Sequence, residues 1–168
     1  MQPEFTPLVW PDDADAAVDF LVADEWPFHG TPRLDREQAA GLSLGGHDVA
    51  AFWVRVDGVP VGLIRAFDLD DIPSGSPLLD IRLAAPYRGR GIGVLAVRWL
   101  TDHLFTRHAL LVRIEATTRH DNTAMQTVLT RCGYRLEGRL VEAWVNDDGT
   151  RADSLIYGLL RREWASVN

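Results

Sequence analysis

Arg88-Gly89-Arg90-Gly91-Ile92-Gly93 is the stretch of this 168-residue sequence that decides the fold. It lies between a run with strand character, residues 78–85, and residues 91–106, in which apolar side chains recur at helical spacing. A strand-to-helix junction with these glycines combines unpaired backbone N–H groups, room for a ligand to approach closely and the positive end of a helix dipole. Arg88 and Arg90 add guanidinium donors that match phosphate oxygens. The stretch therefore predicts a site for a diphosphate group.

Two other interpretations fit the same glycines. One is a glycine turn with solvated arginines. The other is a dinucleotide-binding fold, because Gly91-x-Gly93-x-x-Ala96 satisfies the G-x-G-x-x-G/A fingerprint and Glu115 lies on the next strand at a suitable distance. That fingerprint should open a series of βαβ units, whereas antiparallel hairpins are predicted on both sides of it here. The neighbouring strands thus argue against a dinucleotide fold.

The hairpins are predicted from β-branched and aromatic runs. Residues 50–56 and 59–67 are joined by Asp57-Gly58, a strong two-residue hairpin signal, and residues 134–145 and 152–160 form a closing hairpin. Residues 68–77 have the acidic, glycine and proline content of a surface loop. Strands are also expected over residues 5–10 and 109–118, and helices over about 12–23, from Asp35 onward and over 122–131, with Gly133 as a C-terminal cap.

The composition excludes several classes of protein. With 46% hydrophobic residues, residues 1–168 can form one domain around a single core. No apolar run is long enough for a membrane span and residues 1–10 do not resemble a signal peptide, so we expect a cytoplasmic protein without a membrane partner. A lone Cys132 and unpaired histidines indicate no disulfide and no metal site. The formal charge of −7 argues against nucleic acid, and all 17 basic residues are arginines, which leaves no lysine nucleophile.

Residues 78–160 resemble the GNAT superfamily of N-acetyltransferases, especially the branch similar to ribosomal-protein N-terminal acetyltransferases of the RimJ/RimL type. The resemblance rests on motifs in the right order: Arg88-x-x-Gly91-x-Gly93, then Asn122-Thr-Ala-Met, Arg131-Cys-Gly133-Tyr134 and Glu137-Gly138. It implies an α/β (α+β type) fold with a central, mixed, mostly antiparallel sheet of about six or seven strands, flanked by about four helices. It also implies acetyl-CoA as cosubstrate.

The resemblance assigns residues to the cosubstrate. In that family the glycine motif wraps the pyrophosphate of coenzyme A, and an Asn in the position of Asn122 hydrogen-bonds the pantetheine arm. The strand that ends at Leu83 is expected to splay from its neighbour, so that a free N–H near Leu83 polarises the thioester carbonyl while Ile81 and Leu83 pair with the pantetheine amides. The motif residues expected to bind the cosubstrate are Arg88, Gly89, Arg90, Gly91, Ile92 and Gly93.

Amide formation from a thioester needs a neutral amine and a thiolate that ends up protonated. Asp80 and Glu115 lie on the strands expected to flank the acetyl group, and either is a candidate to anchor the base or a water relay. Ion pairs with Arg82 or Arg113 are the alternative role. An α-amine, with a pKa of about 8, needs less help at pH 7 than a lysine amine.

The acid that protonates the thiolate is the least defined part of the predicted site. Many family members place a tyrosine seven residues after the pantetheine Asn, where this sequence has Leu129. Tyr134 and Tyr157 remain candidates, with packing in the sheet core as their alternative role. Departure of the thiolate without an acid is a third possibility. Cys132 is expected to pack and not to react.

The acceptor wall is predicted at Trp26-Pro27-Phe28-His29-Gly30, between the two N-terminal helices. Trp26, Phe28 and His29 combine aromatic surface with a titratable ring suited to a cation, and a hydrophobic plug is the alternative. We therefore expect an enzyme, monomeric or homodimeric, that transfers an acetyl group to a primary amine such as a protein N-terminus, a small amine or an aminoglycoside. The alternatives are a non-catalytic acetyl-CoA sensor and a Rossmann-like NAD-dependent oxidoreductase.

Overall fold

A mixed sheet of seven strands forms the centre of this computed structural model, which describes residues 2–165. The strands are β1 (Glu4–Pro7), β2 (Ala50–Val56), β3 (Val59–Phe67), β4 (Leu78–Leu83), β5 (Arg113–Arg119), β6 (Arg135–Val145) and β7 (Arg151–Leu160). The helices are α1 (Ala14–Val22), α2 (Arg36–Ala40), α3 (Ile92–Arg107), α4 (Thr123–Arg131) and α5 (Arg161–Ala165), with a 3-10 turn η1 (Ala85–Tyr87) before α3. The strand order is β1-β2-β3-β4-β5-β7-β6, and the β4–β5 pair is parallel while the other neighbours are antiparallel. The expected mixed, mostly antiparallel sheet is confirmed.

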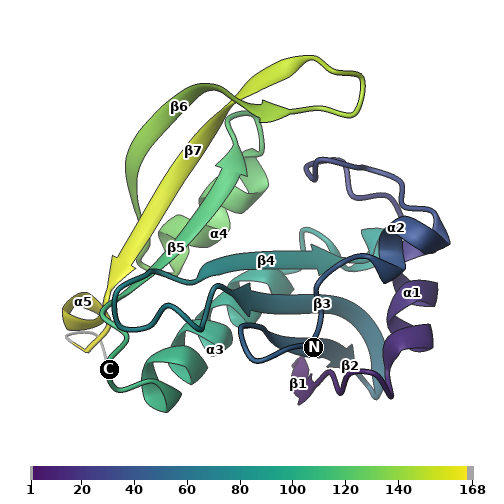
Figure 1. The fold of residues 1–168 in the computed structure, drawn as a ribbon, viewed down its shortest axis with the longest axis horizontal. Helices are drawn as coiled ribbons and strands as arrows, with labels where there is room; N and C mark the ends of the chain where they lie inside the picture. The colour runs from purple at the N-terminus through teal and green to yellow at the C-terminus, as the bar shows by residue number, and fades with distance from the viewer. Residues whose placement is uncertain (1, 166–168) are drawn as a thin grey trace.

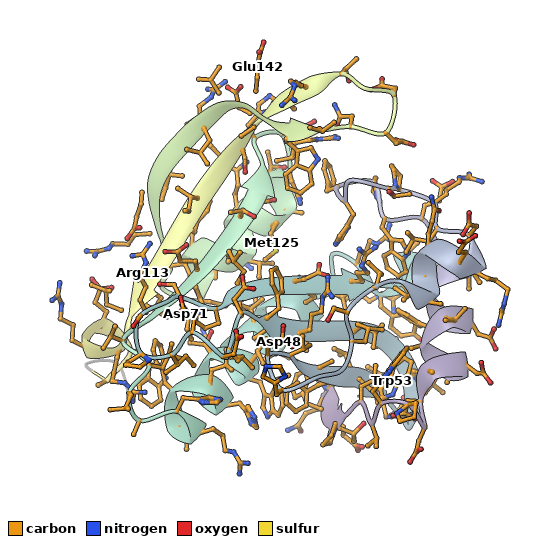
Figure 2. The ribbon with its side chains drawn as sticks, in the orientation of Figure 1. Asp48, Trp53, Asp71, Arg113, Met125 and Glu142 are labelled. Carbon is orange, nitrogen blue, oxygen red and sulfur yellow. The ribbon has the colours of Figure 1, made fainter. Side chains whose placement is uncertain are left out.

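Both predicted hairpins are present. Asp57 and Gly58 have positive φ angles of 52° and 78°, as a two-residue hairpin turn requires, so β2 and β3 have the predicted limits. The β6–β7 hairpin is less regular, with register shifts between Leu136/Gly138 and Leu140/Trp144. Figure 2 shows Glu142, within the second irregular region, projecting from the top of the molecule, where the hairpin bends.

Helices cover both faces of the sheet. Val54 and Ile64 point to the face covered by α3 and α4, whereas Trp53 and Leu63 point to the face covered by α1 and α2. Neighbouring residues of one strand thus serve two cores, because side chains alternate along a strand. Figure 2 shows Trp53 on the α1 side of the molecule.

Two predicted strands are shorter than expected, and local hydrogen bonds explain both differences. The strand predicted over residues 5–10 ends at Pro7, because the Val9 N–H donates to the Asp13 carboxylate at 2.8 Å in the turn that leads into α1. The strand predicted from residue 109 begins at Arg113, because the Leu111 N–H donates to the His108 carbonyl at 3.0 Å and closes a turn after α3.

The parallel pairing of β4 with β5 is short, and the site lies where the two strands separate. Its register contains one pair, Leu78 with Glu115, and the Glu115 N–H donates to the Pro77 carbonyl at 3.0 Å. From there β4 runs toward α1 and α2, and β5 runs toward the β6–β7 hairpin (Figure 1). The predicted splay of the strand that ends at Leu83 is confirmed, and it opens the sheet at its middle.

Candidate functional site

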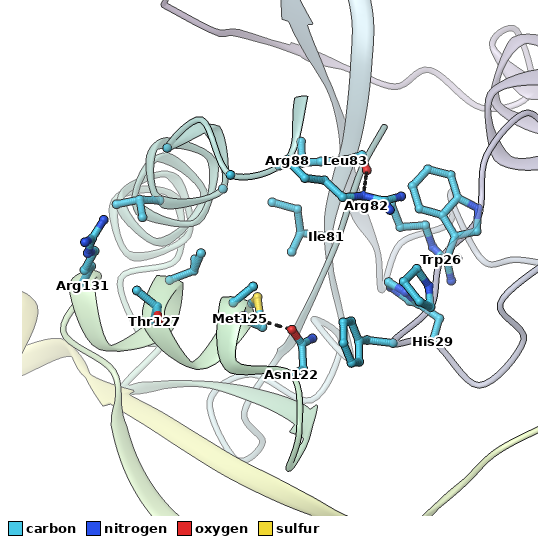
Figure 3. A pocket seen from close by; sticks show the side chains of 18 residues that line it. Trp26, His29, Ile81, Arg82, Leu83, Arg88, Asn122, Met125, Thr127 and Arg131 are labelled. Atoms are coloured by element: carbon cyan, nitrogen blue, oxygen red, sulfur yellow. Dashed lines mark hydrogen bonds between the residues drawn. The ribbon is translucent and has the colours of Figure 1, made fainter. Parts of the chain in front are cut away.

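A cleft of about 420 Å³ lies where β4 and β5 diverge (Figure 3). Its walls come from the segment between α1 and α2, from β4, from the turn into α3 and from α4. The lining residues are Trp26, Pro27, Phe28, His29, Ile81, Arg82, Leu83, Arg88, Gly89, Gly91, Gly93, Val94, Asn122, Ala124, Met125, Thr127, Val128 and Arg131.

The glycine turn forms one end of the cleft. Gly89 and Gly91 have positive φ angles of 72° and 83°, a conformation that side chains with a Cβ rarely adopt. Gly91 directly precedes α3, and its carbonyl accepts from the Val94 and Leu95 N–H groups, which leaves the Ile92 and Gly93 N–H groups without a backbone acceptor among the described residues. A Cβ at Gly93 would lie 3.3 Å from Val128, so a larger residue would press on α4. Free amides and little steric cover are the features that suit a diphosphate.

Arg88 faces away from that turn and toward the α1–α2 segment. Its Nε donates to the Leu83 carbonyl at 2.7 Å and its Nη2 to the Glu25 carbonyl at 2.5 Å, with the Asp24 carboxylate 3.5 Å from Nη2. The guanidinium also lies over the Trp26 ring. Its side chain therefore joins β4 to the segment that begins the opposite wall of the cleft.

Asn122 begins α4 and lies at the centre of the cleft. Its Oδ1 accepts from the Met125 N–H at 3.1 Å, which caps the helix and fixes the side chain. The Nδ2 group has no partner among the described residues and is left to donate to a ligand. Figure 3 shows Asn122 between Met125 and the His29 wall.

The free edge of β4 forms the floor of the cleft. The Ala84 N–H donates to the Val61 carbonyl at 2.9 Å, on the β3 side. Because N–H groups alternate between the two edges of a strand, the N–H of Leu83 points the other way, toward the gap left by β5. A backbone donor is thus directed at the cleft where the resemblance predicts the thioester carbonyl.

His29 and Asp80 meet at the other end of the cleft. His29 Nε2 lies 2.9 Å from Asp80 Oδ1, and Asp80 Oδ2 accepts from Arg65 Nε at 3.0 Å. The Arg82 Nε is farther, 3.8 Å from Asp80 Oδ2. Two arginines and a histidine therefore surround one carboxylate behind the cleft wall.

This environment keeps Asp80 ionised. Burial alone would raise the pKa of its carboxyl, but the hydrogen bond from His29 and the charges of Arg82 and Arg65 outweigh burial and hold the pKa well below its usual range. A carboxylate only accepts hydrogen bonds, so Nε2 of His29 is assigned the proton of the bond to Asp80. Nδ1 is buried and has no partner among residues 2–165.

The other titratable candidates lie outside the cleft lining. Glu115 pairs with Arg113, whose Nε donates to it at 2.6 Å, so its alternative role as an ion-pair partner is what the structure contains. The Tyr134 hydroxyl is buried against the Thr101 hydroxyl at 2.8 Å, and burial raises the pKa of the Tyr134 phenol. Burial also raises the pKa of Tyr157. Leu129 is fully buried in the core.

Cys132 packs, as expected. Its thiol donates to the Val94 carbonyl at 3.4 Å, and burial raises the pKa of the thiol to about 11. Within residues 2–165 no cluster of three or more acidic, His or Cys side chains is arranged to hold a metal ion. None of the described helices has the length and apolar character of a membrane span.

The cleft unites most of the predicted site residues. It is lined by Trp26, Phe28, His29, Ile81, Leu83, Arg88, Gly89, Gly91, Gly93 and Asn122. Asp80 touches it through His29, and Arg90, Ile92, Glu115 and Tyr134 are not in the lining. The sequence reasoning missed the α4 face formed by Met125 and Val128, whose spacing of three residues is a usable signal. It also missed Arg65, which no local pattern connects to Asp80.

Comparisons with known proteins agree with this geometry. The family described as "Acetyltransferase (GNAT) domain" matches residues 5–135. L-2,4-diaminobutyric acid acetyltransferase of Streptomyces coelicolor is 32% identical over 105 residues; the match covers 60% of this chain and 61% of that relative. The chain thus spans less than two thirds of that relative's length.

Solved structures share the fold along nearly the whole chain. Mycobacterium smegmatis RimJ, in complex with CoA-disulfide, is 26% identical with a TM-score of 0.77, and the match covers 96% of this chain and 83% of RimJ. Spermidine N-acetyltransferase of Vibrio cholerae, in complex with CoA and spermine, is 19% identical with a TM-score of 0.79 and 98% coverage of both chains. The second likeness shows the fold alone.

Proposed function

The chain belongs to the GNAT acetyltransferase family, and from this premise we propose that it transfers the acetyl group of acetyl-CoA to a primary amine by direct attack in a ternary complex. One observation carries the proposal. A single cleft has the glycine turn at one end and the His29–Asp80 pair at the other, with Asn122 and the free edge of β4 between them. We propose the same single GNAT domain for residues 1–168.

The cosubstrate end has the groups that a coenzyme A diphosphate and pantetheine arm need. The amides after Gly91 face the diphosphate, and Asn122 Nδ2 donates to a pantetheine carbonyl. The Leu83 N–H stabilises the negative charge that develops on the thioester oxygen as the amine attacks. Arg88 supports this end by fixing β4, because its Nε and Nη2 donate to protein carbonyls.

The acceptor end supplies a base when the His29 ring is neutral, with its proton on Nε2 and a lone pair on Nδ1. His29 Nδ1 takes a proton from the amine, and the Asp80 carboxylate fixes the ring and stabilises the charge that the ring acquires. The amine nitrogen then bonds to the carbonyl carbon, the carbon–sulfur bond breaks and the sulfur leaves as a thiolate. The thiolate takes up a proton from solvent or from His29, so no separate acid is required.

Tyr134→Phe tests whether a phenol acts as the acid. The substitution removes a buried hydroxyl bonded to Thr101, so we expect the free energy of unfolding to fall by about 1 kcal/mol. Turnover is expected to stay within about threefold, because the hydroxyl does not line the cleft. Urea denaturation and initial rates measure the two effects. A large drop in kcat in a variant that still folds would show that the Tyr134 hydroxyl takes part in catalysis.

Two substitutions of Asn122 distinguish its role as a helix cap from its proposed role in ligand binding. Asn122→Ala removes both the helix cap and the Nδ2 donor, whereas Asn122→Ser keeps a capping oxygen and loses only the donor. We expect both variants to bind coenzyme A about 3- to 10-fold more weakly, and only the alanine variant to lose about 1 kcal/mol of stability. Calorimetric titration and thermal melts measure the two effects. Unchanged affinity in the serine variant would contradict the assigned contact.

The proposed function itself is tested in two stages. Calorimetry with acetyl-CoA, coenzyme A and NAD should show binding of the first two only. Thiol release is then followed with peptide N-termini, small amines and aminoglycosides as acceptors. Binding without thiol release from any acceptor would favour a sensor module, and binding of NAD alone would overturn the proposal.

A further inference from the structure

Arg82 is the least satisfied charged group in the molecule's interior. It is 7% exposed, yet none of its five N–H donors makes a hydrogen bond to the residues that the structure describes. Its Nη1 is fully buried and without a partner. Buried guanidinium groups are normally paired, because an unpaired buried charge is costly. Arg82 departs from this pattern.

Asp80 does not satisfy Arg82. Its Oδ1 is occupied by His29 at 2.9 Å and its Oδ2 by Arg65 at 3.0 Å, while the Arg82 Nε stays at 3.8 Å. One carboxylate thus faces two guanidinium groups, and the second of them has no counter-charge of its own. The Trp26 ring supports Arg82 from one side, with 5.5 Å between the ring centre and the guanidinium carbon.

The charged side chains that line the cleft are all cationic. Its charged lining side chains are Arg82, Arg88 and Arg131, and no Asp or Glu of residues 2–165 is in the lining. Arg88 is occupied by backbone carbonyls, and Arg131 lies on α4, across the cleft from Arg82 (Figure 3). Arg82 is therefore the cation of the lining beside His29, and it shares the Asp80 carboxylate with Arg65 while making no hydrogen bond to the described residues. The described lining has no carboxylate that could pair with a polycationic acceptor.

We propose that Arg82 binds a carboxylate carried by the acceptor, so that the substrate is a primary amine with an acidic group a few bonds away. This inference rests on the proposed function and names its substrate class. The planar fork of the guanidinium suits a two-point contact with a carboxylate. His29 Nδ1, from the neighbouring wall, then takes the proton of the amine.

The ligand must arrive from the main cleft. A second cavity touches Arg82, Arg65 and Asp80, but its volume is about 10 Å³. That volume is at the lower limit for one water molecule and too small for a carboxylate. The acceptor end of the main cleft, between Arg82 and His29, is the place with room for the acidic group.

Matched amines test the proposal on the unmodified protein. L-2,4-diaminobutyrate is compared with 1,3-diaminopropane, which is the same diamine without the carboxylate, and with 2,4-diaminobutyramide, which keeps the size and loses the charge. A peptide arm compares N-terminal acceptors with Asp or Asn as second residue. We expect kcat/KM to be about 10- to 100-fold higher for the acid in at least one arm. The arm that responds distinguishes a free amino acid from a peptide.

Substitution of Arg82 gives the second test. Arg82→Met should abolish the preference for the acid, Arg82→Lys should keep part of it, and Arg107→Met, in the exposed last turn of α3 and outside the cleft, should leave the ratio unchanged. The ratio of kcat/KM for acid and amide is measured on one preparation, so partial unfolding cancels. A ratio near one in the unmodified protein, or a ratio unaltered by Arg82→Met, would overturn the inference. Turnover of amines without that preference leaves the proposed function intact, whereas no turnover of any amine overturns the proposed function.

Discussion

Replacing His29 by glutamine is expected to lower kcat with a primary amine by about 100- to 1,000-fold, the usual contribution of a general base. Glutamine keeps a polar side chain of similar reach beside Asp80 but has no lone pair basic enough to take a proton. The affinity for coenzyme A should not change, because the glycine turn, the proposed diphosphate site, lies at the other end of the cleft. Steady-state kinetics and calorimetric titration measure the two quantities.

The pH dependence of the loss in kcat distinguishes a catalytic role of His29 from a structural one. As pH rises toward the pKa of an α-amine, about 8, more acceptor is already neutral and less help from a base is needed. The deficit of His29→Gln should therefore shrink between pH 7 and pH 9. His47→Gln is the matched control, since His47 is largely exposed and lies outside the cleft. A deficit that stays constant with pH would identify His29 as a structural residue.

Asp80→Asn is expected to lower the free energy of unfolding by about 3 kcal/mol at pH 7 and to reduce kcat as well. It removes the one carboxylate near Arg65 and Arg82, and the loss of one partner from a buried ion pair leaves uncompensated charge. It also frees the His29 ring, which the carboxylate holds in its assigned tautomer. Asp147→Asn, in the exposed β6–β7 turn, serves as the control.

The stabilising effect of Asp80 should disappear in acid. The pKa of Asp80 in the folded protein lies below its ordinary value of about 3.9, because the hydrogen bond from His29 and the charges of Arg82 and Arg65 outweigh burial. The contribution is therefore complete above about pH 5 and is lost as pH falls from about 4 through the folded pKa. Urea denaturation at pH 7, 5 and 3 should show the difference between the two proteins narrowing only at pH 3. Equal stability at pH 7 would contradict this account.

Local chemistry explains why so much of the fold could be predicted. Asp57-Gly58 needs only its own backbone angles to make a hairpin, and Asp35 with Gln38 forms a capping box within four residues. The glycine junction likewise depends on a few consecutive residues. Features set by neighbours along the chain were therefore predictable, apart from strand ends such as Pro7 where a side chain competes for the backbone.

The site was less predictable because its decisive contacts join distant residues. His29 and Asp80 are 51 positions apart, and Arg65 reaches Asp80 from the adjacent strand. The sequence suggested that Asp80 pairs with Arg82, yet the closer partners are His29 and Arg65. Arg88 was proposed from its motif alone, and no local pattern indicated that its guanidinium donates to the Leu83 and Glu25 carbonyls. Packing between segments decides such choices, and no local pattern encodes them.

The bonds of Arg88 bear on the order in which two substrates enter. The same guanidinium holds the end of β4 and the carbonyl of Glu25, one residue before Trp26, so the proposed acceptor wall is attached to the proposed diphosphate turn. A ligand that fixes the turn therefore also fixes the wall against which the acceptor binds. We therefore expect compulsory ordered kinetics, with acetyl-CoA as the leading substrate and coenzyme A as the last product to leave.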